Sequence, residues 1–531
     1  MILRARQTFY LIRAVMALAA VNLTVGALPA AAEKTIKMVP RGDLNIVDPI
    51  WSTVAVTRNY GYMVYDTLFS LDANFKPQPQ MVDKVDISAD KLTYTFTLRP
   101  GLKWHDGAPV RAVDCVASIQ RWSKRNIVGQ KLAELTESIE AVGDDSFRIK
   151  LKQPFGVIDA LAEPSNSPAF MMPERIAKTD AFTQIKETIG SGPFIFKKDE
   201  WVPGNKEVFV RNPNYVPRKE APSFLAGGKV VKVDRVEWLH IPDPGTVLVA
   251  LMAGEIDYYE NPPIDYMAAM EKNPKIKILN LDSLGSQGTL RLNHLHPPFN
   301  NVKARLAVLH AIDQEEYMRA VIGNPKYYLK SCWALFGCGA NMETDAGAEP
   351  FKKPDLAKAK QLLKESGYNG EKIVVLDPTN VQVLHAAVTV TVKNLRSIGM
   401  NVDVQAMDVG TMIARRAKKD PPDKGGWHVF HTQFQGIDIF SPASHLYVSA
   451  PCAKGPPGWP CDKGIEDLRD AWAKQADPAK RKEIAVALQK RAYEMVPYIS
   501  TGQFRQPVAY RDSLTGVLAS GATVFWNIDK K

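Results

Sequence analysis

The segment KLTYTFTLRPGLKWHDG, residues 91–107, carries the clearest structural pattern in the chain. From 92 to 98, large apolar side chains alternate with threonines, and this period of two is typical of a strand with one buried face. Pro100-Gly101 then predicts a turn, and residues 147–151 predict a second short strand. We therefore expect a first half that is rich in strands and turns.

The second half of the chain has helical periods with strand-like runs between them. Helices are predicted at 302–321, 354–365, 382–398 and 478–495, and strands at 373–376 and 402–405. A strand–helix–strand order is typical of α/β structure with some parallel pairing. The length of 531 residues favours two or three lobes.

Composition and charge exclude several classes of protein. Apolar residues make up 45% and charged residues 23%, which is ordinary for a globular protein. An uninterrupted apolar run of 18 residues is absent from the sequence, which excludes a polytopic membrane protein. The net charge of +10 is spread out, and its densest run, 415–419, is typical of a solvated helix end. We expect no nucleic-acid partner.

The N-terminus resembles a secretory signal peptide. Residues 1–32 begin with three arginines, continue with an apolar run to Leu28 and end in Ala30-Ala31-Ala32. The alternative is an uncleaved membrane anchor, but Asn22 and Thr24 interrupt the apolar run. We predict cleavage after export and a protein that is not embedded in a membrane.

The five cysteines predict two local disulfides in an exported protein. Cys332 and Cys338 are six residues apart, and Cys452 and Cys461 are nine apart in a loop rich in proline and glycine. Cys115 lies on a helical pattern and is expected to be a buried thiol. The metal-site alternative needs closer spacing such as CxxC, which the sequence lacks.

Motifs for catalysis are weak. Gly190-Ser191-Gly192-Pro193-Phe194 fails as a phosphate loop, and no HExxH zinc motif occurs. Ser88 begins an SxxK motif without the other elements of penicillin-binding enzymes, and His105 lies beside Asp106 in a predicted turn. We expect a binding protein without cofactor or metal rather than an enzyme; a secreted hydrolase is the remote alternative.

A series of motifs in a fixed order resembles family 5 solute-binding proteins, the periplasmic dipeptide, oligopeptide and nickel receptors of ABC importers. The match spans residues 40–515. Its motifs lie at 45–49, 64–69, 91–99, 101–107, 113–114, 190–194, 254–257, 300–305, 311–313, 357–363, 395–400 and 477–481.

This resemblance implies an α/β, two-lobed periplasmic-binding-protein fold (type II-like) with an extra inserted subdomain in the first lobe. The first lobe is expected at 33–57, 190–280 and 499–531, the inserted subdomain at 58–189 and the second lobe at 281–498. The expected function is that of a periplasmic, monomeric receptor. It would close on a peptide or similar small polar solute and deliver it to the permease subunits of an ABC importer.

The resemblance also implies ligand-binding residues. Peptide-binding members have a Trp-x-Ala/Gly-Asp segment whose Asp pairs with the peptide's α-amino group. The corresponding segment here is Phe434-Gln435-Gly436-Ile437-Asp438, in which Asp438 lies one residue late. In an unbroken strand, one step turns the carboxylate to the other face unless a bulge restores it.

This departure leaves open a receptor for a non-peptide solute, such as an oligosaccharide, an opine-like conjugate or a metal chelate. Aromatic and amide side chains near this segment suit either kind of ligand. The full set of ligand-binding candidates is Trp51, Arg291, Asn293, Trp427, His431, Phe434, Gln435, Asp438, Phe504 and Arg505.

Overall fold

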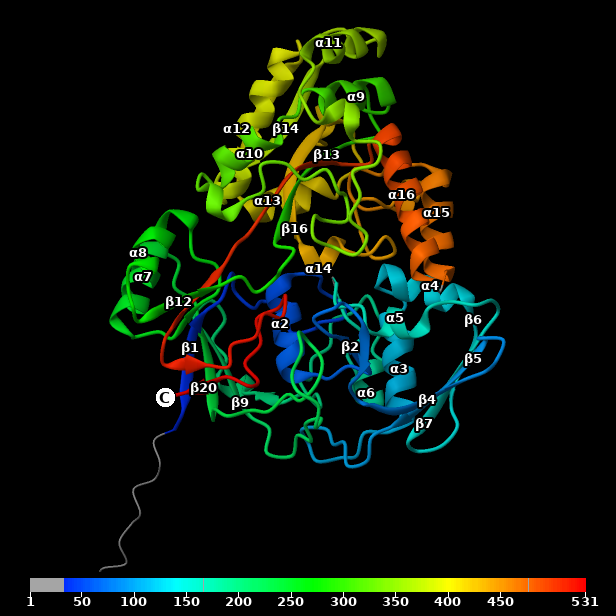
Figure 1. Ribbon diagram of the computed structural model, residues 1–531, viewed down its shortest axis with the longest axis vertical. Helices are drawn as coiled ribbons and strands as arrows, with labels where there is room; N and C mark the ends of the chain where they lie inside the picture. The colour runs from blue at the N-terminus through cyan, green and yellow to red at the C-terminus, as the bar shows by residue number, and fades with distance from the viewer. Residues whose placement is uncertain (1–32, 166, 476) are drawn as a thin grey trace, which may run out of the picture. The chain divides into compact units, whose positions relative to one another are not determined.

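A seven-stranded, a five-stranded and a four-stranded sheet organise the described part of the protein (Figure 1). The computed structural model describes residues 33–165, 167–475 and 477–531. The predicted signal peptide, 1–32, lies outside the described residues. None of the helices within these ranges is both long and apolar enough to cross a bilayer.

The seven-stranded sheet is mixed and has the order β12-β18-β11-β1-β10-β9-β8. Strand β1 pairs in parallel with β10 and β11, and the outer pairs are antiparallel. Its members are β1 (Thr35–Val39), β8 (Phe194–Phe196), β9 (Lys206–Arg211), β10 (Arg235–Leu239), β11 (Tyr258–Tyr259), β12 (Ile276–Leu279) and β18 (Val508–Arg511).

The four-stranded sheet is antiparallel and contains the strands predicted first. Its order is β4 (Val82–Ile87), β5 (Thr93–Leu98), β7 (Ser146–Leu151) and β6 (Thr136–Ala141). In β5, Tyr94, Phe96 and Leu98 are buried whereas the three threonines are half-buried, which confirms the alternation. Helix α3 (Ala112–Trp122) packs on this sheet and carries the buried free thiol of Cys115, as predicted.

The five-stranded sheet has the order β15-β14-β16-β13-β17. Strands β14 (Lys372–Pro378) and β15 (Asn401–Met407) are parallel and joined by α12 (Gln382–Ser397), which confirms the predicted strand–helix–strand unit. Gly399, with φ of +100°, turns the chain after the helix. The antiparallel strands are β13 (Ser286–Leu292), paired with β16 (Val429–Gln435) and β17 (Ile499–Phe504).

The helices largely follow the predictions, with one division. The span 302–321 forms α9 (Val302–His310) and α10 (Gln314–Val321), because Asp313 accepts hydrogen bonds from the backbone N–H groups of Glu315 and Glu316 and so begins a new helix. The other two predicted helices are α11 (Leu356–Glu365) and α16 (Pro478–Met495).

Shorter elements complete the fold. They are α2 (Ala55–Val64), α4 (Ile127–Leu135), α5 (Val157–Leu161), α6 (Glu174–Ala177), α7 (Pro244–Ala253), α8 (Met267–Glu271), α13 (Val409–Arg416), α14 (Gly436–Ile439), α15 (Lys463–Lys474), β2 (Phe69–Leu71), β3 (Pro77–Pro79), β19 (Leu514–Thr515) and β20 (Asp529–Lys530).

Two connections join the seven- and five-stranded sheets. Residues 280–285 run from β12 to β13, and 505–507 run from β17 to β18. Strand β17 falls in the range predicted for the first lobe, yet it pairs with β13 in the five-stranded sheet, with Ser286 opposite Phe504. Because β17 is hydrogen-bonded into the five-stranded sheet, the second connection between the two sheets, 505–507, follows β17 rather than preceding it.

Both predicted disulfides are present. Cys332 is bonded to Cys338 and Cys452 to Cys461. Each closes a short loop, so each restricts the unfolded chain locally.

Candidate functional site

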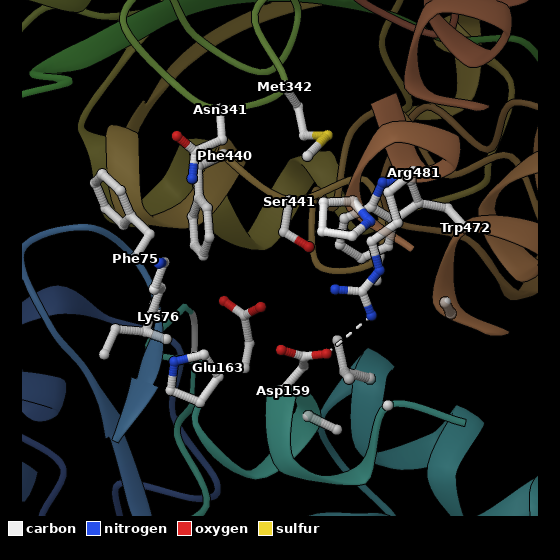
Figure 2. A pocket seen from close by; sticks show the side chains of 18 of the residues that line it. Phe75, Lys76, Asp159, Glu163, Asn341, Met342, Phe440, Ser441, Trp472 and Arg481 are labelled. Carbon is white, nitrogen blue, oxygen red and sulfur yellow. Dashed lines mark hydrogen bonds and ion pairs between the residues drawn. The ribbon is translucent and has the colours of Figure 1, made fainter. Parts of the chain in front are cut away.

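A cavity of about 280 Å³ lies between residues 71–163 on one side and residues 341–481 on the other (Figure 2). One side, the N-terminal wall, consists of the β2–β3 turn at 71–77 with Val128 and residues 155–163 around α5. The other side, the C-terminal wall, consists of 341–342, 440–443, α15 residues and the start of α16. A cavity of this size, walled by distant segments, is typical of a site for a small ligand.

Aromatic side chains line both walls. The rings of Phe75 and Phe440 stack with centroids 5.3 Å apart and planes inclined by 28°. Met342 and Trp472 add apolar surface on the C-terminal wall. The stacked pair therefore connects the two walls and offers flat apolar surface to a ligand.

An ion pair also connects the walls. Arg481, in the first turn of α16, donates from Nη2 to Oδ2 of Asp159 on α5 at 2.8 Å, and its guanidinium lies 4.6 Å from the centre of the Trp472 ring. Figure 2 shows this pair at one end of the cavity. Because Asp159 is nearly half exposed, solvent screens the pair and its contribution to stability is small.

Glu163 is the buried carboxylate of the cavity. Its residue is 7% exposed, and Figure 2 shows its carboxylate directed into the cavity below Phe440. The backbone N–H of Ser165 donates to Oε1 at 3.3 Å. Burial raises the pKa of Glu163 to about 7; hydrogen bonds from Ser165 oppose this rise, and the charge of Asp438 adds to it.

Asp438 is paired with an arginine from the other end of the sequence. Nη1 of Arg58, on α2, lies 2.5 Å from Oδ1 of Asp438, and Nη2 donates to the side-chain oxygen of Gln435. Strand β16 ends at Gln435, and Asp438 lies in the helical turn α14, so the pleat of the strand does not set the direction of its carboxylate.

A larger groove of about 680 Å³ continues from the cavity. The two share Val128, Phe155, Ala443 and Ala473 in their linings. Lys131 on α4 crosses the groove to Asp470 on α15, with Nζ 2.7 Å from Oδ2. Figure 1 shows α4 directly below α15. A ligand longer than the cavity therefore has space to extend into the groove.

Four of the predicted ligand-binding residues lie in the protein interior, away from the cavity. Arg291 donates to the carbonyl oxygens of Tyr447, Pro457 and Pro497, with burial lowering its pKa to about 10. Asn293, Trp427 and His431 lie in the same interior. Asn293 donates to the carbonyl oxygen of Trp427, and the Trp427 indole donates to the carbonyl oxygen of Arg416. His431 contacts the Thr391 hydroxyl at 2.7 Å.

The remaining candidates are dispersed. Trp51 donates to the carbonyl oxygen of Phe182 and lies below Arg125, outside the cavity lining. Phe434 packs edge-on against Tyr447, with ring centroids 4.6 Å apart. Phe504 and Arg505 line a separate pocket of about 210 Å³ beside Cys338. Arg58 brings Gln435 and Asp438 together.

None of the ten predicted ligand-binding residues lines the cavity. Phe440 and Ser441 follow Asp438 almost directly, so extending the candidate segment by three residues would have included them. No local pattern marked Phe75 or Glu163, and Arg481 lies in the motif at 477–481 without having been predicted to bind a ligand. The approach of all three to the cavity depends on the tertiary fold.

The weak catalytic motifs have structural roles. The Ser88 hydroxyl donates to Asp90 and accepts from the backbone N–H of Thr93, which closes the turn before β5. His105 contacts the carbonyl oxygen of Gly192 at 3.2 Å, and burial lowers its pKa to about 4. A Cβ on Gly190 would lie 2.0 Å from the carbonyl oxygen of Val64, so close backbone packing requires this glycine. Groups of three or more metal-ligating side chains are absent from the described ranges.

Comparisons with known proteins place this geometry in context. The model of the family "Bacterial extracellular solute-binding proteins, family 5 Middle" matches residues 76–454. The probable peptide ABC transporter periplasmic-binding protein y4tO of Sinorhizobium fredii (strain NBRC 101917 / NGR234) is 40% identical over 94% of each chain. The glutathione-binding protein GsiB of Escherichia coli O1:K1 / APEC is 26% identical over 92% of each chain.

A solved structure shows the same fold. It is the ABC transporter-associated periplasmic binding protein DppA from Helicobacter pylori, in complex with the peptide STSA. It is 22% identical, covers 94% of this chain and 98% of its own, and has a TM-score of 0.79. The predicted α/β fold, with two lobes and an inserted subdomain, is thereby confirmed.

Proposed function

The chain belongs to the family 5 bacterial extracellular solute-binding proteins, and from this premise we propose that it binds peptides and delivers them to an ABC importer. The family consists of solute-binding proteins rather than enzymes. The relative that is 40% identical across nearly the whole chain is described as a peptide receptor of this kind, which favours peptides over other solutes.

A cavity with one wall from residues 71–163 and the other from residues 341–481 carries the proposal. The Phe75–Phe440 stack and the Asp159–Arg481 ion pair connect these walls. A ligand between them contacts both, so it stabilises the arrangement in which the walls are close. Connections 280–285 and 505–507 are the segments about which we propose that the two lobes move.

We propose the periplasm as the site of action and the permease subunits of the importer as the partner. The N-terminal pattern of a signal peptide and the periplasmic relatives support the location. We further propose that the protein acts as a monomer, which size-exclusion chromatography with light scattering tests directly.

The experiment is native mass spectrometry of protein that is purified from the periplasm without refolding. We expect a ladder of bound masses spaced by amino-acid residues. Ser441→Trp would place a large ring where Figure 2 shows the Ser441 hydroxyl entering the cavity, and should abolish the ladder. The matched control is Val249→Trp, at a 67% exposed position on α7, which should retain it. No bound peptide in wild-type protein would contradict the proposal.

A non-peptide solute is the second candidate, and the engagement of Asp438 by Arg58 favours it. With that carboxylate neutralised, the segment that pairs with an α-amino group in peptide-binding members presents no free negative charge here. A single bound mass that matches an oligosaccharide, an opine-like conjugate or a metal chelate, in place of a ladder, would support this candidate.

A further inference from the structure

We propose that Glu163 binds the cationic terminus of the ligand in this protein. The inference rests on the proposed function, because it concerns the same cavity and a peptide-like ligand. It assigns the α-ammonium group to a residue near α5, on the N-terminal wall, instead of to the segment that ends in Asp438.

The first step is that Asp438 already has an internal cation. The Arg58 side chain is 2% exposed, and its guanidinium lies 2.5 Å from the Asp438 carboxylate and also donates to Gln435. A ligand ammonium at Asp438 would have to compete with this guanidinium. Removing a buried, charge-paired guanidinium from its carboxylate is strongly unfavourable, so another carboxylate is better placed to bind the ligand.

The second step is that Glu163 is an acceptor without a cationic partner. Within the described ranges, no lysine, arginine or histidine forms an ion pair with it, whereas the neighbouring Asp159 is paired with Arg481. Glu163 is buried and its carboxylate enters the cavity (Figure 2). An ammonium in the cavity would supply the missing positive charge to a carboxylate that solvent barely reaches.

The third step concerns the groups that surround Glu163. Asp438 on α14 is paired with Arg58 on α2, Tyr62 on α2 is a buried neutral phenol, and the Ser444 hydroxyl donates to the carbonyl oxygen of Ser441. Asp159 and Arg481, in the same lining, offset one another. The charged neighbours of Glu163 therefore offset one another, which leaves the Glu163 carboxylate itself to attract a cation.

Lys76 provides the complementary charge. It is exposed on the β2–β3 turn of the same wall, lines the cavity and forms no ion pair within residues 33–165, 167–475 and 477–531. A ligand with ammonium at one end and carboxylate at the other would match Glu163 and Lys76. The cavity chemistry therefore selects zwitterions with a free amino terminus.

The sign of the pH dependence follows from the burial of Glu163. Its pKa in the unliganded protein is about 7, and a bound ammonium would lower it, so binding near pH 7 should release protons. Below pH 7 a proton competes with the ligand, and the affinity should fall by up to tenfold per pH unit between pH 7 and 5.5. This dependence of affinity on pH can be measured with wild-type protein alone.

The experiment uses two pools of random-sequence tri- to pentapeptides, one with free amino termini and one N-acetylated. Binding to wild-type protein, Glu163→Gln and the exposed control Glu483→Gln is followed by native mass spectrometry and isothermal titration calorimetry, the latter in phosphate and in Tris. We expect Glu163→Gln to lose at least tenfold in affinity for free-amine peptides and to lose the proton release and the pH dependence. The control should match wild type.

The outcomes separate this inference from the proposed function. If Glu163→Gln binds free-amine peptides as tightly as wild type does, the role of Glu163 is overturned and peptide binding stands. The same holds if wild type binds both pools with equal affinity. Failure of wild type to bind either pool would overturn both. Thermal unfolding of Glu163→Gln establishes that the variant is folded.

Discussion

Replacing Arg58 by methionine should destabilise the protein, because it leaves the Asp438 carboxylate buried without its guanidinium. The Arg58 side chain is 2% exposed and that of Asp438 is 12% exposed, so solvent compensates little for the lost partner. Breaking one side of a buried ion pair costs about 3–5 kcal/mol, and the partial exposure of Asp438 favours the lower end. At about 2.1 cal/mol/K of unfolding entropy per residue, a unit of roughly 500 residues loses about 3 °C in Tm for 3 kcal/mol.

Differential scanning calorimetry at pH 7 measures this change. The double variant Arg58→Met/Asp438→Asn removes the unpaired charge and should recover part of the lost Tm. The matched control is Lys463→Met, which breaks the exposed Lys463–Asp467 pair on α15 and should leave Tm unchanged. An Arg58→Met variant with the Tm of wild type, or a double variant that recovers nothing, would refute the reasoning.

Further predictions concern the loop disulfide, a buried histidine and the aromatic stack. Cys452→Ser/Cys461→Ser opens a loop of nine residues and should cost about 2.5 kcal/mol, or roughly 2–3 °C in Tm, with ligand affinity unchanged in calorimetric titration. Burial lowers the pKa of His431 to about 3, so its stabilising effect is present above pH 6.5 and is lost as pH falls toward 3. Between pH 6.5 and 4.5 this loss lowers the free energy of unfolding by up to about 1.4 kcal/mol per pH unit, and His431→Phe should remove it, which is measured as a flatter dependence of Tm on pH. Phe440→Ala removes the ring that stacks on Phe75 and should weaken peptide binding about tenfold, measured by calorimetric titration, with little change in Tm.

Local patterns predicted much of the fold because they report local physics. The alternation at 92–98 reflects the two faces of β5, and the run from 373 to 405 reflects a parallel strand pair with its helix. The division of the helix at 302–321 was missed, although Asp313 is a good N-cap, because the apolar period continues across it.

The candidate site was less predictable because its contacts join distant residues. Arg58 meets Asp438 across 380 positions of sequence, and no local pattern marks such a pair. Trp427 and His431 were predicted for their aromatic character, but that character does not reveal whether a side chain faces a ligand or the interior. His431 lies on β16, and Trp427 precedes this strand. In the structure both are buried with partners in the interior.

A crystal structure of the protein with the ligand that co-purifies with it tests the central claim most directly, namely that a peptide is bound between the two walls. We predict density for an extended peptide beside Phe440, with its amino terminus within hydrogen-bond distance of the Glu163 carboxylate. Density for the solute in another pocket, such as the one beside Phe504 and Arg505, with the cavity empty of ligand, would contradict the account.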